Sequence, residues 1–298
     1  MWLVLGLMSA ALLGCYDILQ KVSLQENAVI PVLFFSALTG ALIFIPLLIL
    51  SKINPDASRF FWYIPDVTFQ SHLFFMLKSF IVGSQWILAY FAIKNLPLTI
   101  VSPIRSSAPL WTLLGAIIIF GERLNTWQWI GLSTTILFYY LFSLAGLKEG
   151  ISFRKNKWAL FMTFATIIGS ISSLYDKFLV LHFNRMAMQA WYEIYMVPYI
   201  GIVLLLFWVP GRQKTTLFKW KHTIPFIAVV LTLSDFLYFR GLAYPGALIS
   251  IMTTLRRGSV IISFIMGAIL FHEKNIKLKA FILLGILAGI CLIMFKGN

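Results

Sequence analysis

The chain has 298 residues, of which 60% are hydrophobic and only 11% are charged, and this composition excludes a soluble enzyme. A soluble domain carries about 25% charged residues, which keep its surface in contact with water. The formal net charge of +14 does not indicate a nucleic-acid-binding protein, because the basic residues stand in short gaps between apolar runs and form no continuous basic patch.

Apolar runs long enough to cross a bilayer fill most of the chain. A membrane-spanning helix needs about 20 apolar residues, and in lipid only helices and closed barrels satisfy every backbone polar group. Because the runs lack the alternation of strands, they predict an all-α integral membrane protein with ten transmembrane helices. In chain order the predicted spans are 2–22, 28–50, 72–93, 97–121, 126–146, 157–182, 187–209, 223–243, 246–271 and 276–296.

The gaps between the runs indicate how the chain enters the membrane. The first run starts without a basic leader, so it is interpreted as a span and not as a cleaved signal peptide. The longest gap, 51–71, contains Pro55 and Pro65 and predicts an irregular or interfacial loop. Most loop lysines and arginines lie in the odd-numbered gaps, which by the positive-inside rule places both termini outside the cytoplasm.

Two sets of residues recur in the second half of the chain. Tyr16-Asp17 recurs as Tyr175-Asp176, and each pair ends a stripe of small residues at helical spacing. The segment 104–122 is also repeated at 255–273 with one constant offset for its charged positions. Such self-similarity predicts an internal repeat.

The repeat divides the predicted spans into two sets of five, in residues 1–150 and 151–298. Since five is an odd number, the second set enters the membrane upside down relative to the first. An inverted repeat of this kind is typical of secondary transporters, whose substrate site lies near the bilayer midplane between the two halves.

The motifs that close the repeated segments resemble those of a known group. Phe120-Gly121-Glu122 and Phe271-His272-Glu273 follow the fourth and ninth spans, and the first continues as Glu122-Arg123-Leu124. The chain resembles the drug/metabolite transporter superfamily, and within it the EamA-type proteins. The resemblance implies ten helices in two five-helix repeats, transport of a metabolite and, against the loop charges, cytoplasmic termini. The continuation Glu273-Lys274-Asn275 matches the family pattern less well.

Ionisable residues inside the predicted spans are candidates for function, because a charge in the membrane is costly. Basic residues outnumber acidic ones in this set, and the surplus favours a substrate with an anionic group. The set consists of Asp17, Lys78, Arg105, Asp176, Lys177, Glu193, Asp235, Arg240, Arg256 and Arg257.

Three arginines are predicted to bind substrate. Arg105 stands between Pro103 and Pro109, which remove backbone donors and leave a broken polar stretch. Its repeat counterpart Arg256 is followed by Arg257, and adjacent residues on a helix point about 100° apart, so one of the two faces a cavity. A guanidinium group is well shaped to bind phosphate or carboxylate. The alternative is that the arginines form buried ion pairs with aspartates of neighbouring helices.

Four further residues are predicted to line the cavity. Lys78 and Gln85 are seven residues apart on one face of the third span. Tyr192 and Glu193 lie together in the seventh span, where Glu193 would carry a coupling proton or bind an ammonium group. The alternative for Glu193 is an ion pair with Lys177.

The three aspartates of the spans are assigned to structural ion pairs or to proton coupling. Asp17 and Asp176 end stripes of small residues, which favours pairing with Lys21 or with a neighbouring helix. Asp235 is a candidate partner for an arginine.

The sequence therefore predicts a secondary transporter that moves a polar, anionic or zwitterionic small metabolite by alternating access. The alternative is a flippase for a lipid-linked phosphate or sugar-phosphate, and an intramembrane enzyme is a remote third, since the chain holds no nucleophile–base motif. Cys15 and Cys291 lie in apolar runs, so no disulfide, metal or cofactor is expected. The expected partners are the substrate and the lipid bilayer, without nucleic acid. We expect a monomer in a bacterial plasma membrane, with Gly285-x-x-x-Gly289 as a helix-contact motif.

Overall fold

The computed structural model describes residues 2–54, 56–108, 110–112, 126–147, 155–212, 216–244, 252, 255–256, 258–270 and 276–294. Within these ranges all regular structure is helical. Arg257, Pro109 and the two Phe-x-Glu motifs lie outside the described residues, as does the side chain of Lys177.

Ten α-helices and two short irregular helices follow one another along the described chain. The α-helices are α1 (Trp2–Leu24), α2 (Val29–Ile53), α3 (Phe69–Asn95), α4 (Leu98–Ser106), α6 (Thr126–Leu147), α7 (Lys157–His182), α8 (Arg185–Val203), α9 (Thr223–Leu242), α11 (Ser259–Leu270) and α12 (Ile276–Met294). A 3₁₀ turn, η1 (Ala57–Arg59), lies in the loop after α2, and a π-helix, η2 (Leu204–Trp208), extends α8.

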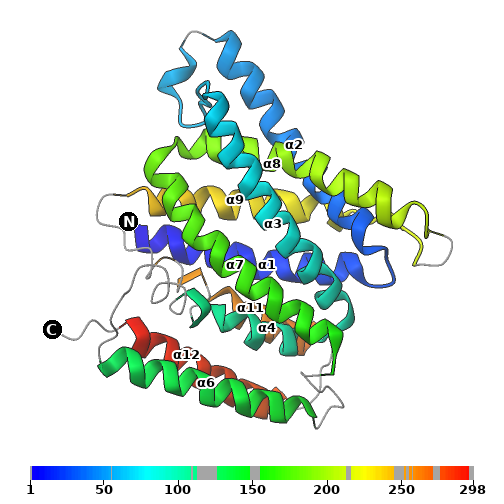
Figure 1. The fold of residues 1–298 in the computed structure, drawn as a ribbon, viewed down its shortest axis with the longest axis vertical. Coiled ribbons are helices and arrows are strands. Elements are labelled where there is room, and N and C mark those ends of the chain that lie inside the picture. Colours follow the sequence, from blue (N-terminus) through cyan, green and yellow to red (C-terminus); the bar gives the residue numbers. More distant parts are fainter. Residues whose placement is uncertain are drawn as a thin grey trace.

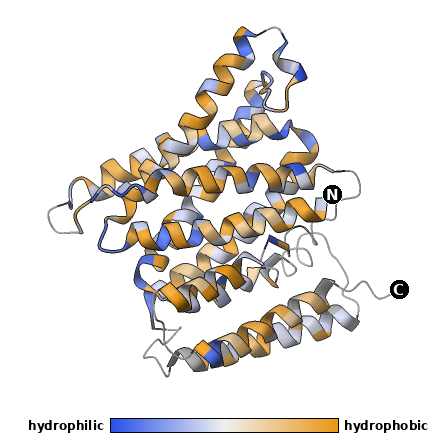
Figure 2. Ribbon diagram, turned by 180° about the vertical axis from the view of Figure 1, so that it is seen from behind, coloured by the Kyte–Doolittle hydropathy of each residue, from blue (hydrophilic) through white to orange (hydrophobic). Residues whose placement is uncertain are grey.

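Six of the described helices are long and apolar enough to cross a membrane: α1, α2, α3, α7, α8 with η2, and α9. Hydrophobic residues colour most of their length, whereas hydrophilic residues gather at helix ends and in loops (Figure 2). Large apolar side chains such as Leu7, Phe164 and Leu205 are exposed on the outside of the bundle, where lipid would cover them. The chain is therefore an integral, multi-pass membrane protein.

Polar caps set several helix ends in this apolar sequence. Asn156 begins α7 by accepting backbone N–H bonds from Trp158 and Ala159 at 2.9 and 3.3 Å. Asn184 caps α8 in the same way, so α8 begins at Arg185, two residues before the predicted start. Thr68 caps α3, which therefore begins three residues before the predicted boundary. The cap of a helix supplies partners for its first free N–H groups, so it fixes the boundary more sharply than hydropathy does.

Most of the large helix contacts join the first half of the chain to the second. α1 packs along α9, α3 along α7, α2 along α8, and α6 along α12 (Figure 1). α4 packs against α11, and these two helices also contact α7 and α1, respectively. The two halves therefore interlock.

The glycines of α12 contact α6 of the same chain. A side chain at Gly285 would meet the ring of Phe138, and one at Gly289 would meet the backbone of Gly131 and Thr135. The predicted helix-contact motif thus operates within one protein molecule.

A polar cluster, here named the Asn27 clasp, joins the α1–α2 turn to the segment before α9. The Asn27 amide donates to the Lys219 carbonyl at 2.7 Å and accepts from the Lys219 N–H at 2.8 Å, and the hydroxyls of Ser23 and Thr223 lie 2.6 Å apart. The ammonium of Lys221 donates to carbonyls at the end of α1, and its partial burial lowers the pKa of that group. Cations stabilise helix C-termini because the helix dipole is negative there.

Candidate functional site

A cavity of about 130 Å³ lies between α1, α3, α7 and α9. Aromatic side chains, including Tyr16, Trp86 and Tyr238, form part of its wall. Charged and amide side chains converge on the same space, as expected of a ligand site. These polar liners include Lys78, Gln85, Arg105, Asp176, Asp235 and Arg256.

Three ion pairs surround the cavity, and each joins two elements of the bundle. They are Lys78–Asp176 between α3 and α7, Arg105–Asp17 between α4 and α1, and Arg256–Asp235 between the segment before α11 and α9. The side chains of Lys78 and Asp17 are buried, and those of Arg105 and Arg256 are 18% and 19% exposed. Removal of one partner would leave a buried charge without compensation, which is strongly destabilising.

Asp17 is bound by two helices at once. One carboxylate oxygen accepts from Arg105, and the other accepts from the Ser263 hydroxyl of α11 at 2.5 Å. Asp17 does not line the cavity. Its cationic partner is Arg105 and not Lys21, whose ammonium instead donates to the carbonyls of Ile93 and Leu96.

Arg105 is placed by the end of α4. The helix stops at Ser106, directly after the arginine, and the hydroxyl of Ser106 donates to the carbonyl of Pro103 at 2.7 Å. The Ser107 hydroxyl likewise donates to the Ile104 carbonyl at 2.7 Å. These two serine hydroxyls thus bind carbonyls of the last turn, whereas the buried hydroxyl of Ser102 in the same helix has no partner among the described residues.

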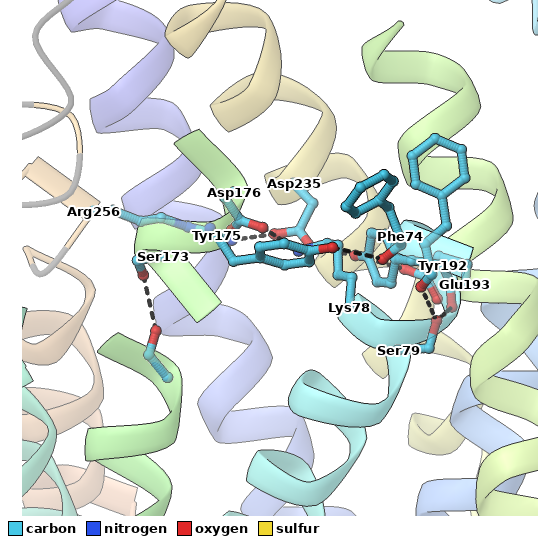
Figure 3. Close-up of polar contacts among 12 residues, drawn as sticks. Phe74, Lys78, Ser79, Ser173, Tyr175, Asp176, Tyr192, Glu193, Asp235 and Arg256 are labelled. Carbon is cyan, nitrogen blue, oxygen red and sulfur yellow. Dashed lines mark hydrogen bonds and ion pairs between the residues drawn. The ribbon is translucent and has the colours of Figure 1, made fainter. Parts of the chain in front are cut away.

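Asp235 also has two partners, and they come from different segments of the chain (Figure 3). One oxygen pairs with Arg256, and the other accepts a hydrogen bond from the Tyr192 hydroxyl at 2.6 Å. The Arg256 guanidinium lies 4.3 Å from the centre of the Tyr238 ring, a cation–π contact. Its Nε–H has no partner among the described residues.

Lys78 is enclosed by aromatic rings as well as by its carboxylate. Its ammonium lies 4.7 Å from the centre of the Tyr192 ring and 5.5 Å from that of Phe239, while it donates to Asp176. The cation is therefore partly desolvated and held in one place, at the junction of α3, α7 and α8.

Glu193 lies beyond Tyr192 and outside the cavity lining (Figure 3). Its side chain is 2% exposed, and its Oε1 is 3.2 Å from the Tyr192 hydroxyl. On the α2 side, a side chain at Gly40 would meet the carboxyl group, so the glycine provides the space for it. Glu193 has no ion pair among the described residues, and its predicted partner Lys177 falls outside the described side chains.

The structure brings most of the predicted substrate residues to one cavity. Lys78, Gln85, Arg105, Tyr192 and Arg256 all line it. Gln85 packs against Gly169 of α7, where no side chain competes for the space. Their role in binding substrate stays a prediction.

The predicted surplus of cations does not appear among the described cavity residues, where each cation has one carboxylate. In the sequence, the excess of basic over acidic residues in the spans came from Lys177, Arg240 and Arg257. Arg240 is exposed near the end of α9, and the other two side chains are outside the description. An anionic substrate therefore does not follow from charge balance alone.

Sequence reasoning missed the hydroxyl and ring partners of the charged residues. Ser263 lies in an apolar helix where nothing in the sequence distinguishes it from a packing residue, and the same holds for Tyr238 beside Arg256. The repeat would pair Asp176 with Arg256 as Asp17 pairs with Arg105. Instead, Lys78 and Asp235 take these two partners.

Comparison with known proteins adds the family. No curated protein matches the sequence at a significant level. The structure resembles 27 chains of solved structures. One of them, described as the crystal structure of a protein, has a TM-score of 0.65 and 11% sequence identity, with 98% of this chain and 96% of the other covered. At this identity the likeness shows the fold alone.

Residues 1–144 match the family model of the EamA-like transporter family. The match covers α1 to most of α6, which contribute Asp17, Lys78, Gln85 and Arg105 to the site. The resemblance predicted from the sequence is thereby confirmed over residues 1–144, which are similar to the EamA-like transporter family.

Proposed function

We propose that the protein is a secondary transporter that carries a small zwitterionic or anionic metabolite through the central cavity by alternating access. The observation that carries the proposal is the ring of three ion pairs around one cavity between the two halves of the chain. The family match over residues 1–144 supports it.

The pattern of helix contacts supports an inverted repeat of residues 1–150 and 151–298. If α1, α2, α3, α4 and α6 correspond in order to α7, α8, α9, α11 and α12, the observed contacts exchange in pairs. The contact of α1 with α9 becomes that of α7 with α3, and α2 with α9 becomes α8 with α3. Ten helices related by a twofold axis in the membrane plane would have this property, and alternating access would rock one half against the other.

The paired charges favour a zwitterion over a simple anion. An anion that takes an arginine from its aspartate leaves a buried carboxylate without a partner, which is costly. A zwitterion brings its own ammonium group, which compensates the negative charge left in the site, so the balance of buried charges is unchanged. The cavity is small beside the roughly 300–1,000 Å³ of drug-sized pockets, which suits a small metabolite.

We assign the substrate carboxylate to Arg256, with Lys78, Gln85 and Tyr192 around it. The assignment rests on the free Nε–H of Arg256 and on the position of its side chain in the cavity wall. A guanidinium group binds a carboxylate through two parallel hydrogen bonds, so this N–H is available for a second contact. Arg105 and Arg257 remain candidates for the opposite end of the substrate.

The proposal is tested with purified protein and a panel of amino acids, phosphorylated sugars, nucleosides and polyprenyl phosphates. A ligand that binds the native state raises the melting temperature by mass action. We expect a zwitterionic metabolite to stabilise the protein, whereas stabilisation by a polyprenyl phosphate alone would favour the flippase.

The stabilising metabolite is then used for uptake into proteoliposomes. We expect Arg256→Gln to lose uptake. The matched control is Arg59→Gln, since Arg59 pairs with Asp56 on the exposed surface and its removal leaves uptake unchanged. Full uptake by Arg256→Gln would remove this arginine from the substrate site.

A further inference from the structure

The Tyr192 hydroxyl lies between the carboxyl groups of Asp235 and Glu193, but it can donate only one hydrogen bond. It donates to Asp235 Oδ2 at 2.6 Å and lies 3.2 Å from Glu193 Oε1. An ionised carboxylate has acceptors only, and a phenol has a single O–H donor. With that hydrogen on the shorter bond to Asp235, a hydrogen bond between Glu193 and Tyr192 requires a proton on Glu193.

The charges around Glu193 lead to the same result. On the elements packed against α8, Lys78 of α3 is paired with Asp176 of α7, Asp235 of α9 with Arg256, and His72 of α3 with Tyr195 at 2.8 Å. Arg240 of α9 is exposed, and the side chain of Lys177 of α7 lies outside the described residues. On α2, the residue beside the carboxyl group is Gly40. An ionised Glu193 would thus be a buried charge without a cation among the described residues, which is more costly than the neutral acid.

We propose that Glu193, Tyr192 and Asp235 form a proton relay that controls whether Arg256 is free to bind an anionic group. Glu193 gives its proton to the Tyr192 oxygen while the Tyr192 hydrogen passes to Asp235 Oδ2. Two O–H bonds break and two form, so the net change is the transfer of one proton from Glu193 to Asp235. No group is oxidised or reduced.

The transfer changes the partner of Arg256. Before it, the guanidinium faces an ionised Asp235. After it, Asp235 is a neutral acid, and Arg256 is a cation in the cavity wall without a counter-charge. A substrate carboxylate in the cavity then gains the charge-assisted hydrogen bonds that Asp235 has given up, and the ammonium group of a zwitterionic substrate offsets the negative charge that now lies on Glu193. The use of the relay in transport rests on the proposed function, but the proton on Glu193 is a property of the resting protein.

The position of the proton is tested by infrared spectroscopy of the full-length protein in lipid vesicles, without substrate. We expect a carboxylic-acid C=O band that shifts in D₂O and is lost in Glu193→Gln. In Tyr192→Phe the acid loses its acceptor, so the band should persist and move to higher frequency. Tyr195→Phe is the matched control, one turn along α8 with its hydroxyl on His72, and should leave the band unchanged.

Two results would overturn the relay. If Glu193→Gln removes no carboxylic-acid band, Glu193 is ionised. If the frequency of the band is the same in Tyr192→Phe as in the unmodified protein, the acid and the phenol share no hydrogen bond. Neither result depends on the identity of the substrate, so the relay and the proposed function can fail separately.

The control of Arg256 is tested with acetate as the anion. Asp235→Asn imitates the protonated carboxyl group, so we expect acetate to raise its melting temperature in a concentration-dependent way that the unmodified protein lacks. The double variant Asp235→Asn/Arg256→Gln should lose this response. An Asp235→Asn protein that folds and ignores acetate would refute the link between Asp235 and Arg256.

Discussion

At the scale of single residues, each buried aspartate of the site has a cation, and two of them also have a hydroxyl. Asp17 accepts from Ser263 and Asp235 from Tyr192, in addition to their arginines. A carboxylate in a low-dielectric interior loses its water and must recover several hydrogen bonds from the protein. In the proposed transport cycle, these second partners would hold the carboxylates in position when an arginine turns to the substrate.

The pair Lys78–Asp176 gives a direct test of this arrangement. Lys78→Met should lower the free energy of unfolding by about 3–5 kcal/mol, because Asp176 remains as an unpaired buried charge. The double variant Lys78→Met/Asp176→Leu should recover most of that loss. Thermal unfolding in detergent measures both.

The matched control for this pair is Lys52→Met, whose partner Asp66 is exposed. An exposed pair contributes about 0–1 kcal/mol, so little change is expected. A double variant as unstable as Lys78→Met would show that the pair does not act as a unit.

The sequence identified Lys78, Arg105 and Arg256 as charged residues of the spans, but not the ion pairs that they form, and it placed Glu193 in the cavity lining, from which it is absent. Ionisable residues are rare in membrane spans, so Lys78, Arg105 and Arg256 could be identified by their type alone. The partner of each depends on how helices cross, and helical periodicity does not determine that. That Asp176 pairs with Lys78, and Asp235 with Arg256, is therefore visible only in the structure.

At the scale of helices, small residues bring α6 and α12 together over much of their length. The two α12 glycines, Gly285 and Gly289, face different types of atoms on α6. A side chain at Gly285 would meet the Phe138 ring, which can turn, whereas one at Gly289 would lie 2.8–2.9 Å from backbone atoms of α6. Backbone atoms in packed helices cannot move without separating the helices.

Gly289→Ala should therefore destabilise the protein more than Gly285→Ala does. Overpacking of this kind costs about 1–3 kcal/mol, and we expect Gly289→Ala near the upper end of that range. Unfolding in mixed micelles compares the two variants, which carry the same added methyl group. Equal effects would mean that α6 adjusts as readily as a side chain.

Helix positions were more predictable than helix ends. The apolar runs located α1, α2, α3, α7, α8 and α9, and the predicted span 157–182 coincides with α7. α3 and α8 begin a few residues earlier than predicted, because Thr68 and Asn184 cap these helices upstream of the first strongly apolar residues. Hydropathy averages over a window, whereas a cap acts at one residue.

At the scale of the whole molecule, the Asn27 clasp ties the two halves together at one end of the bundle. The hydroxyls of Ser23 and Thr223 lie 2.6 Å apart there, so cysteines at these positions are close enough for a disulfide. If the halves must separate at this end during transport, the oxidised Ser23→Cys/Thr223→Cys protein should be inactive, and reduction should restore uptake.

This cross-linking experiment needs a background without the native thiols, since Cys15 and Cys291 are both exposed. The two single cysteine variants in that background are the controls, and they should transport under oxidising conditions. Unchanged uptake by the oxidised double variant, with the cross-link verified by mass spectrometry, would show that the clasp stays closed throughout the cycle.

The clasp lies at the end of the bundle that the loop charges predict to face the cytoplasm. Lys21, Lys94 and Lys221 are at this end, and each donates to backbone carbonyls of neighbouring segments. The same lysines therefore stabilise helix ends and contribute to the excess of positive loop charge on which the positive-inside rule is based. The topology of the termini stays a prediction, opposed by the family resemblance.

The interlocking of the two halves has a consequence for biogenesis. The faces of α1, α2 and α3 that are buried by α9, α8 and α7 are complete only once the later helices have been synthesised. Until these later helices are synthesised, the charges of Asp17 and Lys78 lack part of the hydrogen bonds and ion pairs that stabilise them in the folded protein. The reason is that Ser263, which donates to Asp17, and Asp176, which pairs with Lys78, belong to later helices. A nascent chain of this design depends on the insertion machinery until the ribosome has nearly finished.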